Sequence, residues 1–116
     1  AHPERSPGFQ RDPNRLGRLV DAGALCSLTA GAFGGQFGGL VQRASLNLLS
    51  AGLCHGVASD AHDAVHRGPA LLDGLPGVRP GASDVPAHVR WLTTDAPAAI
   101  LAGDDLPDPP PPLRRR

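Results

Sequence analysis

The chain has 116 residues, which suits one small domain or part of a larger one, and 41% of them are apolar, enough to form a core. Its formal net charge is zero and Lys is absent, so there is no basic surplus to attract nucleic acid. No apolar run approaches the roughly 18–20 residues of a membrane span, and we expect a cytoplasmic protein.

The first part of the chain predicts a loop, a helix and a strand. Residues 1–11 carry Pro, Gly and charge, which is typical of a loop that leaves a strand. Asp12 and Pro13 then form a helix-start signal, and Gly23 marks the end of that helix. The short apolar run 24–29 follows this cap and predicts a buried strand.

A glycine-rich segment separates this strand from a second helix and strand. Residues 30–39 combine several glycines with two Phe, which indicates a backbone that turns sharply or approaches a ligand closely. The clearest helix spans residues 40–51 and ends at Gly52, and residues 53–59 form the second predicted strand. The apolar side chains predicted to share one face of the helix are Leu40, Val41, Ala44, Leu48, Leu49 and Ala51.

This order of helix, strand, helix and strand predicts an α/β protein with parallel strands and flanking helices. Beyond the second strand we expect a helix near residues 68–74, a Gly/Pro-rich loop to about residue 82, and two short helices over 83–92 and 95–102. The final segment, residues 104–116, predicts a disordered, polyproline-like tail with nothing to pack.

Asp60 and His62 directly follow the second predicted strand. Residues i and i+2 of an extended segment point the same way, so both side chains should project past the carboxyl end of the strand. In parallel α/β folds that end is where sites are built, and a carboxylate beside an imidazole suits a hard or borderline cation. The alternative is a cap-and-loop pair in which Asp60 accepts backbone N–H bonds.

The segment His2-Pro3-Glu4-Arg5 and the isolated Arg67 are the other candidates for chemistry. Pro3 holds the preceding His2 extended, and a guanidinium is a planar fork suited to phosphate. Glu4 is suited to orienting a ligand or to pairing with an Arg. Each candidate also has an interpretation without a chemical role. His2 would then be a histidine packed within the fold, and Arg67 would be a surface residue at the start of a helix.

Cysteine-based phosphatase chemistry is excluded by spacing. Cys26 and Cys54 lie in apolar runs and are interpreted as buried small hydrophobes. Neither is followed six positions later by the Arg that cradles phosphate over a reactive thiolate, and a Lys-containing phosphate loop is also absent. Of the other histidines, we expect His55 to pack within its strand and His88 to lie on a surface helix.

Taken together, three segments and one further arginine resemble a known family. They are residues 2–5, the glycine-rich residues 29–38, residues 58–62 and Arg67, in family order and at family-like separations. The chain resembles the capsular-polysaccharide type of protein-tyrosine phosphatase in the PHP (polymerase and histidinol phosphatase) superfamily. The likeness extends from residue 2 to about residue 103 and is more specific than any of its parts.

The resemblance implies a fold and a set of metal ligands. Residues 1–103 would be the carboxyl-terminal half of a distorted β/α barrel, which binds a multinuclear metal cluster at the carboxyl ends of its strands. The metal is usually manganese, and other divalent metals stay open. The ligands implied in this sequence are His2, Asp60 and His62.

The resemblance also implies an activity. Arg5 and Arg67 would handle the phosphate, and Asp60 would in addition accept a proton from the attacking water. The substrate class would be phosphotyrosine on a bacterial tyrosine kinase that controls polysaccharide export.

This sequence departs from the family pattern because the amino-terminal H-x-H ligand pair and a mid-domain Glu and His are absent. Three ligands cannot hold a multinuclear cluster, so we expect an enzyme that is active only as the complete domain, of which this chain is a fragment. The alternatives are another PHP phosphoesterase, such as a histidinol-phosphate phosphatase, or an inactive truncated piece that acts only in binding. Open barrel edges and exposed apolar faces argue against a stable monomer, which leaves a homo-oligomer open.

Overall fold

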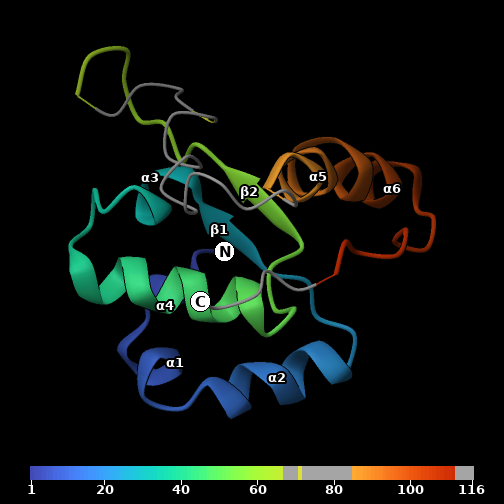
Figure 1. The fold of residues 1–116 in the computed structure, drawn as a ribbon, viewed down its shortest axis with the longest axis horizontal. Coiled ribbons are helices and arrows are strands. Elements are labelled where there is room, and N and C mark those ends of the chain that lie inside the picture. The colour runs from blue at the N-terminus through green and yellow to red at the C-terminus, as the bar shows by residue number, and fades with distance from the viewer. Residues whose placement is uncertain (67–70, 72–84, 112–116) are drawn as a thin grey trace.

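The computed structural model describes residues 1–66, 71 and 85–111 (Figure 1). The predicted helix at 68–74, the loop to residue 82 and Arg67 therefore lie outside the described residues, apart from residue 71. The elements in chain order are the 3₁₀ helix η1 (Pro3–Arg5), α1 (Pro7–Arg11), α2 (Pro13–Asp21), β1 (Ser27–Thr29), α3 (Ala30–Phe33), α4 (Gly39–Ser50), β2 (Gly56–Ala58), α5 (Val85–Arg90), the π-helical turn η3 (Trp91–Asp95) and α6 (Ala96–Ala102).

Strands β1 and β2 pair in parallel, which confirms the α/β class with parallel strands. Leu28 lies opposite Val57 in the register, and both side chains are buried. Figure 1 shows α4 and α2 on one side of the strand pair and α5 with α6 on the other. The backbone N–H of His2 donates to the carbonyl of Ser27 at 2.7 Å, so the start of the chain runs beside β1.

Helices α2 and α4 end at the glycines that the sequence predicts. After α4, the N–H of Gly52 donates to the carbonyl of Leu49 and the N–H of Leu53 to that of Leu48, which is the Schellman pattern. Gly52 has φ 74°, a conformation that costs other residues energy, and Gly23 after α2 has φ 103°. These ends fix where the chain turns back toward β1 and β2.

The buried face of α4 differs from the predicted one. Leu48 and Leu49 are buried as expected, but Leu40 is 59% exposed. Ser45, which was not among the residues predicted to share the apolar face, is wholly buried. The hydroxyl of Ser45 donates to the carbonyl of Val41 at 2.9 Å, so this small side chain can be buried without an unpaired donor. The helix is therefore rotated relative to the face read from its largest side chains.

A single helical run replaces the two separate helices predicted near the carboxyl terminus. α5, η3 and α6 follow one another from residue 85 to residue 102 without a break. Pro97 has no N–H, so the i→i−4 ladder must be interrupted beside it, and the wider π turn falls immediately before α6. The hydroxyl of Thr93, in this turn, donates to the carbonyl of Val89 in α5 at 2.6 Å.

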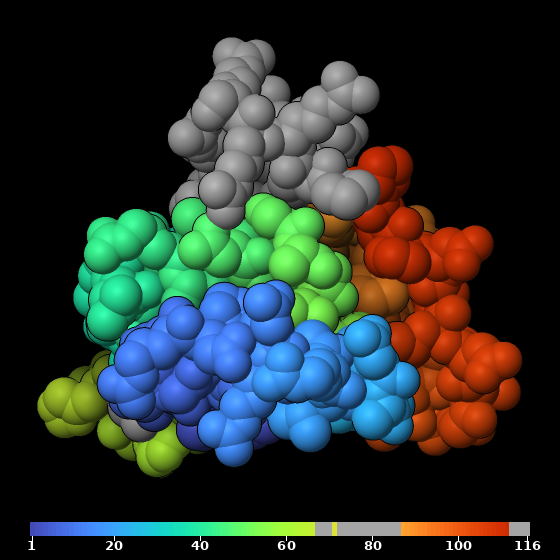
Figure 2. Space-filling view, turned by 90° about the horizontal axis from the view of Figure 1, so that it is seen from below, coloured from blue at the N-terminus to red at the C-terminus, as the bar shows by residue number. Residues whose placement is uncertain are grey.

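The carboxyl-terminal segment packs more than its composition predicts. Residues 104–111 have no helix or strand and are mostly exposed, but Leu106 packs against the core and the carbonyl of Pro107 accepts a bond from the Trp91 indole. The space-filling view shows this segment against the α5–α6 region (Figure 2). The prediction that nothing here packs is thus wrong for residues 106–107, because a Leu and proline carbonyls find partners. Residues 112–116 lie outside the described part.

The core combines aliphatic side chains with one Phe and the single Trp. Leu28, Phe33 and Leu92 are at most 1% exposed, and Trp91 is 6% exposed. In the described part of the chain, no helix has the length and apolarity needed to cross a membrane.

Candidate active site at the carboxyl ends of the strands

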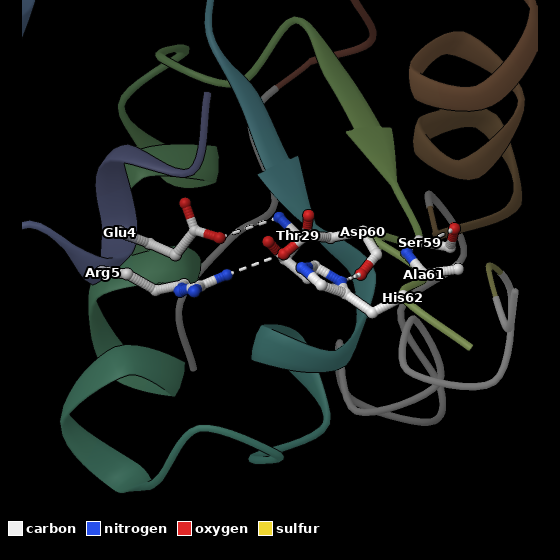
Figure 3. Close-up of polar contacts among 7 residues, drawn as sticks. All are labelled: Glu4, Arg5, Thr29, Ser59, Asp60, Ala61 and His62. Atoms are coloured by element: carbon white, nitrogen blue, oxygen red, sulfur yellow. Dashed lines mark hydrogen bonds and ion pairs between the residues drawn. The ribbon is translucent and has the colours of Figure 1, made fainter. Parts of the chain in front are cut away.

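The site lies where the two parallel strands end. β1 ends at Thr29 and β2 at Ala58, and residues 59–62 continue from β2 on the same side (Figure 3). Helix η1 packs against β1 and α4, which brings the first motif to the same edge. Two motifs that are distant in sequence are therefore neighbours.

The contact between these motifs is an ion pair. Nη1 of Arg5 donates to Oδ2 of Asp60 at 2.9 Å, and the two side chains are 28% and 30% exposed. The guanidinium also lies over the ring of Phe37, 4.6 Å from its centroid. Phe37 belongs to the glycine-rich segment, where Gly35 and Gly38 have positive φ, so all three motif segments meet around Arg5.

Glu4 anchors η1 to the end of β1. Its side chain is wholly buried, and Oε1 accepts the backbone N–H of Thr29 at 2.8 Å. Its carbonyl accepts the side-chain amide of Gln10 at 2.7 Å, while Oε2 has no hydrogen-bond partner among the described residues. The interaction differs from the Arg pairing considered from sequence, because the buried strand end offers an N–H that no neighbouring strand uses.

The segment after β2 bends at Asp60 and is not the extended run expected from sequence. Asp60 has φ 53°, in the left-handed region that Asp tolerates better than most residues. The ring Nδ1 of His62 lies 2.8 Å from the carbonyl oxygen of Asp60, and the hydroxyl of Ser59 accepts the N–H of Ala61. The turn directs the Asp60 carboxylate at Arg5 and exposes the His62 ring (Figure 3).

His2 and Asp60 share an uncommon backbone conformation. Among the described residues other than glycine, these two are the ones with positive φ, 39° for His2 and 53° for Asp60. The extended conformation predicted for His2 before Pro3 is therefore wrong, because the residue adopts the left-handed region instead. Both are predicted metal ligands. Strained backbone is concentrated at functional sites, so this coincidence supports a shared functional edge.

The described residues do not, however, form a metal centre by themselves. No group of three or more His, Cys, Asp or Glu side chains within residues 1–66, 71 and 85–111 is arranged to hold a metal ion. His2 and His62 are exposed, and the carboxylate of Asp60 is engaged by Arg5. The ligand roles of His2, Asp60 and His62 therefore stay predictions, as does the role of Arg67, which is outside the described residues.

Both cysteines are buried and free, which confirms their interpretation as small hydrophobes. Burial raises the pKa of the Cys54 thiol to about 12 and also raises the pKa of the Cys26 thiol. A protonated thiol is a poor nucleophile, so the pKa values agree with the exclusion of cysteine-based phosphatase chemistry.

His55 is packed within the fold as predicted. Its Nδ1 accepts the backbone N–H of Cys26 at 2.9 Å, and its own N–H donates to the carbonyl of Cys26. Burial lowers the pKa of His55, which favours a neutral ring with its proton on Nε2.

All of these contacts fall within the span that one protein family covers. Residues 1–101 match the family model described as capsular polysaccharide synthesis, CpsB/CapC. The chain belongs to the CpsB/CapC family.

Two curated relatives show what the chain is similar to. The tyrosine-protein phosphatase YwqE of Bacillus subtilis (strain 168) is 34% identical over 117 residues, covering 100% of this chain and 45% of YwqE. CapC of Staphylococcus aureus is 37% identical over 75 residues, covering 65% of this chain and 29% of CapC. The chain thus spans less than half the length of these relatives.

A solved structure supports the CpsB/CapC assignment at the level of the fold. It comes from a study of YwqE from Bacillus subtilis and CpsB from Streptococcus pneumoniae, described there as unique metal-dependent tyrosine phosphatases. The TM-score is 0.77 at 34% identity, covering 98% of this chain and 45% of that one.

Two contacts in the site were not predicted from the sequence. The contact of Phe37 with Arg5 had one indication, the aromatic residues in a segment expected to approach a ligand. The hydrogen bond from Thr29 to Glu4 had only one indication in the composition, which is that Glu4 is the single glutamate in the chain. Neither signal specifies a partner, which only the fold supplies.

Proposed function

We propose that this chain supplies one side of the active site of a metal-dependent phosphatase that hydrolyses phosphotyrosine in proteins and acts in capsule or exopolysaccharide synthesis. The observation that carries the proposal is the meeting of three motif segments around the Arg5–Asp60 pair at the carboxyl ends of the strands. Membership of the CpsB/CapC family and similarity to YwqE support the same reading.

Arg5 is the proposed phosphate-binding residue within the described part. Its guanidinium is partly exposed, and both Asp60 and the Phe37 ring restrict its position. A guanidinium has five N–H donors in a rigid fork, so it can bind phosphoryl oxygens while one donor stays on Asp60. We propose that Arg67 is a second phosphate-binding residue.

His2, Asp60 and His62 are proposed as part of the ligand set for a divalent metal, with manganese first. They do not make a complete centre alone, so the proposal requires further ligands from the rest of the domain. Asp60 is also proposed as a proton acceptor. In the complete enzyme, the fold would be a PHP-type distorted barrel, the location cytoplasmic, and the substrate a bacterial tyrosine kinase of polysaccharide export.

The decisive experiment replaces the matching segment of YwqE with this chain. The chimera is assayed with a phosphotyrosine peptide, histidinol phosphate and a nucleotide, with and without manganese. We expect manganese-dependent hydrolysis of the phosphotyrosine peptide above the other substrates. A folded, metal-loaded chimera that prefers histidinol phosphate, or hydrolyses nothing, would contradict the proposal.

Substitutions in the chimera separate the proposed roles. Asp60→Ala or His62→Ala should abolish turnover and reduce the manganese content measured by elemental analysis. Arg5→Ala and Arg67→Ala should leave the metal content unchanged and lower kcat/KM, because a lost charge-assisted bond to phosphate weakens transition-state binding. Arg18→Ala, on the exposed surface of α2, is the matched control. If Arg67→Ala behaved like that control, its assigned role would be wrong.

A further inference from the structure

The segment after α6 returns across the molecule toward the carboxyl end of α4 (Figure 1). Two side chains of the α5–η3 helix meet it. Nε1 of Trp91 donates to the carbonyl of Pro107 at 3.1 Å, and Nε2 of His88 lies 2.9 Å from the carbonyl oxygen of Pro111. The prediction that His88 lies on the surface is wrong, because its exposed fraction is only 7%. Trp91 is 6% exposed.

The chemistry of these contacts matches a proline-rich strand. Proline has no backbone N–H, so the run from Pro107 to Pro111 presents carbonyl acceptors, with Asp108 its one backbone donor. Trp91 presents an indole N–H, which is a donor only, beside a flat apolar ring. Consecutive prolines also favour the polyproline II conformation before binding, which lowers the entropy lost on docking.

The segment leaves space against the wall it covers. A cavity of about 390 Å³ lies between residues 106–111 and a wall that includes Cys54, His55, His88 and Trp91. Only Leu106 and Pro110 of this segment are even partly buried. Few side chains therefore hold it, and its two recorded hydrogen bonds run from helix side chains to its backbone, as in recognition of a peptide.

We propose that Cys54, His55, His88 and Trp91 line a groove that binds proline-rich, polyproline II peptides, and that the chain's own 106–111 segment is its intramolecular ligand. This proline groove lies on the α5–η3 side of the sheet and uses none of the residues assigned to phosphate chemistry. The proposal is therefore independent of the proposed phosphatase activity.

Trp91 provides a direct readout because the chain has one Trp and no Tyr. Ending the chain after Asp105 should shift the Trp91 emission to longer wavelength and increase its quenching by acrylamide. Adding residues 105–113 as a synthetic peptide should reverse both changes in a saturable manner. The same peptide should leave the full chain unchanged, because its groove is occupied.

Matched controls distinguish a binding groove from simple packing. A chain ended after Pro112 should behave like the full chain, and a peptide with each Pro replaced by Ala should fail to restore the emission. His88→Ala in the chain ended after Asp105 should weaken peptide binding roughly three- to tenfold, the effect of one hydrogen bond. If the chain ended after Asp105 keeps its circular dichroism spectrum but the peptide does not change its Trp91 emission, the groove assignment is overturned.

A second variant covers the case in which truncation unfolds the chain. Pro109→Gly, Pro110→Gly and Pro111→Gly, combined in the full chain, remove the polyproline preference while keeping the length. The proposal requires Trp91 to become more accessible to acrylamide in this variant. Quenching equal to that of the parent chain would overturn it.

Discussion

Glu4 is wholly buried, and its one recorded side-chain bond, from the N–H of Thr29, joins the first motif to the end of β1. Glu4→Ala should lower the free energy of unfolding by about 1.5–3 kcal/mol, the range for a lost hydrogen bond to a charged group. Urea denaturation of the chain measures this change. Glu4→Gln keeps an acceptor for Thr29 and should cost less. Equal losses for Ala and Gln would show that the bond to Thr29 is not the cause.

His55 makes the stability of the chain depend on pH. Burial lowers its pKa from the ordinary value of 6.5, so the folded protein takes up a proton less readily than the unfolded chain. The unfolded chain therefore binds more protons in this window, and the stability present above pH 6.5 is lost as the pH falls below it. Thermal unfolding across this range measures the effect.

His55→Asn is the matched control for this pH dependence. The amide oxygen of Asn can accept the Cys26 N–H in place of the ring Nδ1, but the amide does not titrate. The variant should therefore unfold with a smaller change in stability between neutral and mildly acidic pH. An unchanged pH profile would assign the effect to another group.

At the scale of elements, helix ends are the features that local sequence determines best. Gly52 closes α4 with φ 74°, so Gly52→Ala should destabilise the chain by about 1–2 kcal/mol through left-handed strain. Gly17, inside α2, has open space around an added Cβ, so Gly17→Ala should stabilise by about 0.5–1 kcal/mol. Chemical denaturation of both variants gives the comparison, and changes of the same sign would contradict this account.

Across the whole molecule, the sequence predicts what local chemistry decides. Capping glycines and apolar runs located α2, β1, α4 and β2, and residues 59–62 were correctly placed after the second strand. The loop predicted over residues 1–11 was wrong, because this segment forms η1 and α1. The buried face of α4 could not be predicted, because it depends on Ser45 satisfying its hydroxyl locally. The packing of residues 106–107 was missed for a related reason, since proline composition does not reveal that a Trp N–H lies nearby.

The candidate site likewise combines features that the sequence predicted with features that only the fold determines. The grouping of His2, Asp60 and His62 in one site was implied by the family resemblance, whereas the contact between Arg5 and Phe37 depends on distances that only the folded chain sets. Within residues 1–66, 71 and 85–111, no group of three or more His, Cys, Asp or Glu side chains is arranged to hold a metal ion.

The left-handed backbone conformation of His2 and Asp60 lowers the stability of the fold at two positions with proposed functional roles. Glycine would adopt both conformations without the roughly 1–2 kcal/mol that a side chain costs there, and the His2 N–H could still reach Ser27. A library of this chain selected for heat resistance alone should thus accumulate glycine at position 2, and at position 60 wherever the Arg5 pair contributes less than the strain. Selection of the chimera for catalysis should return histidine and aspartate to those positions.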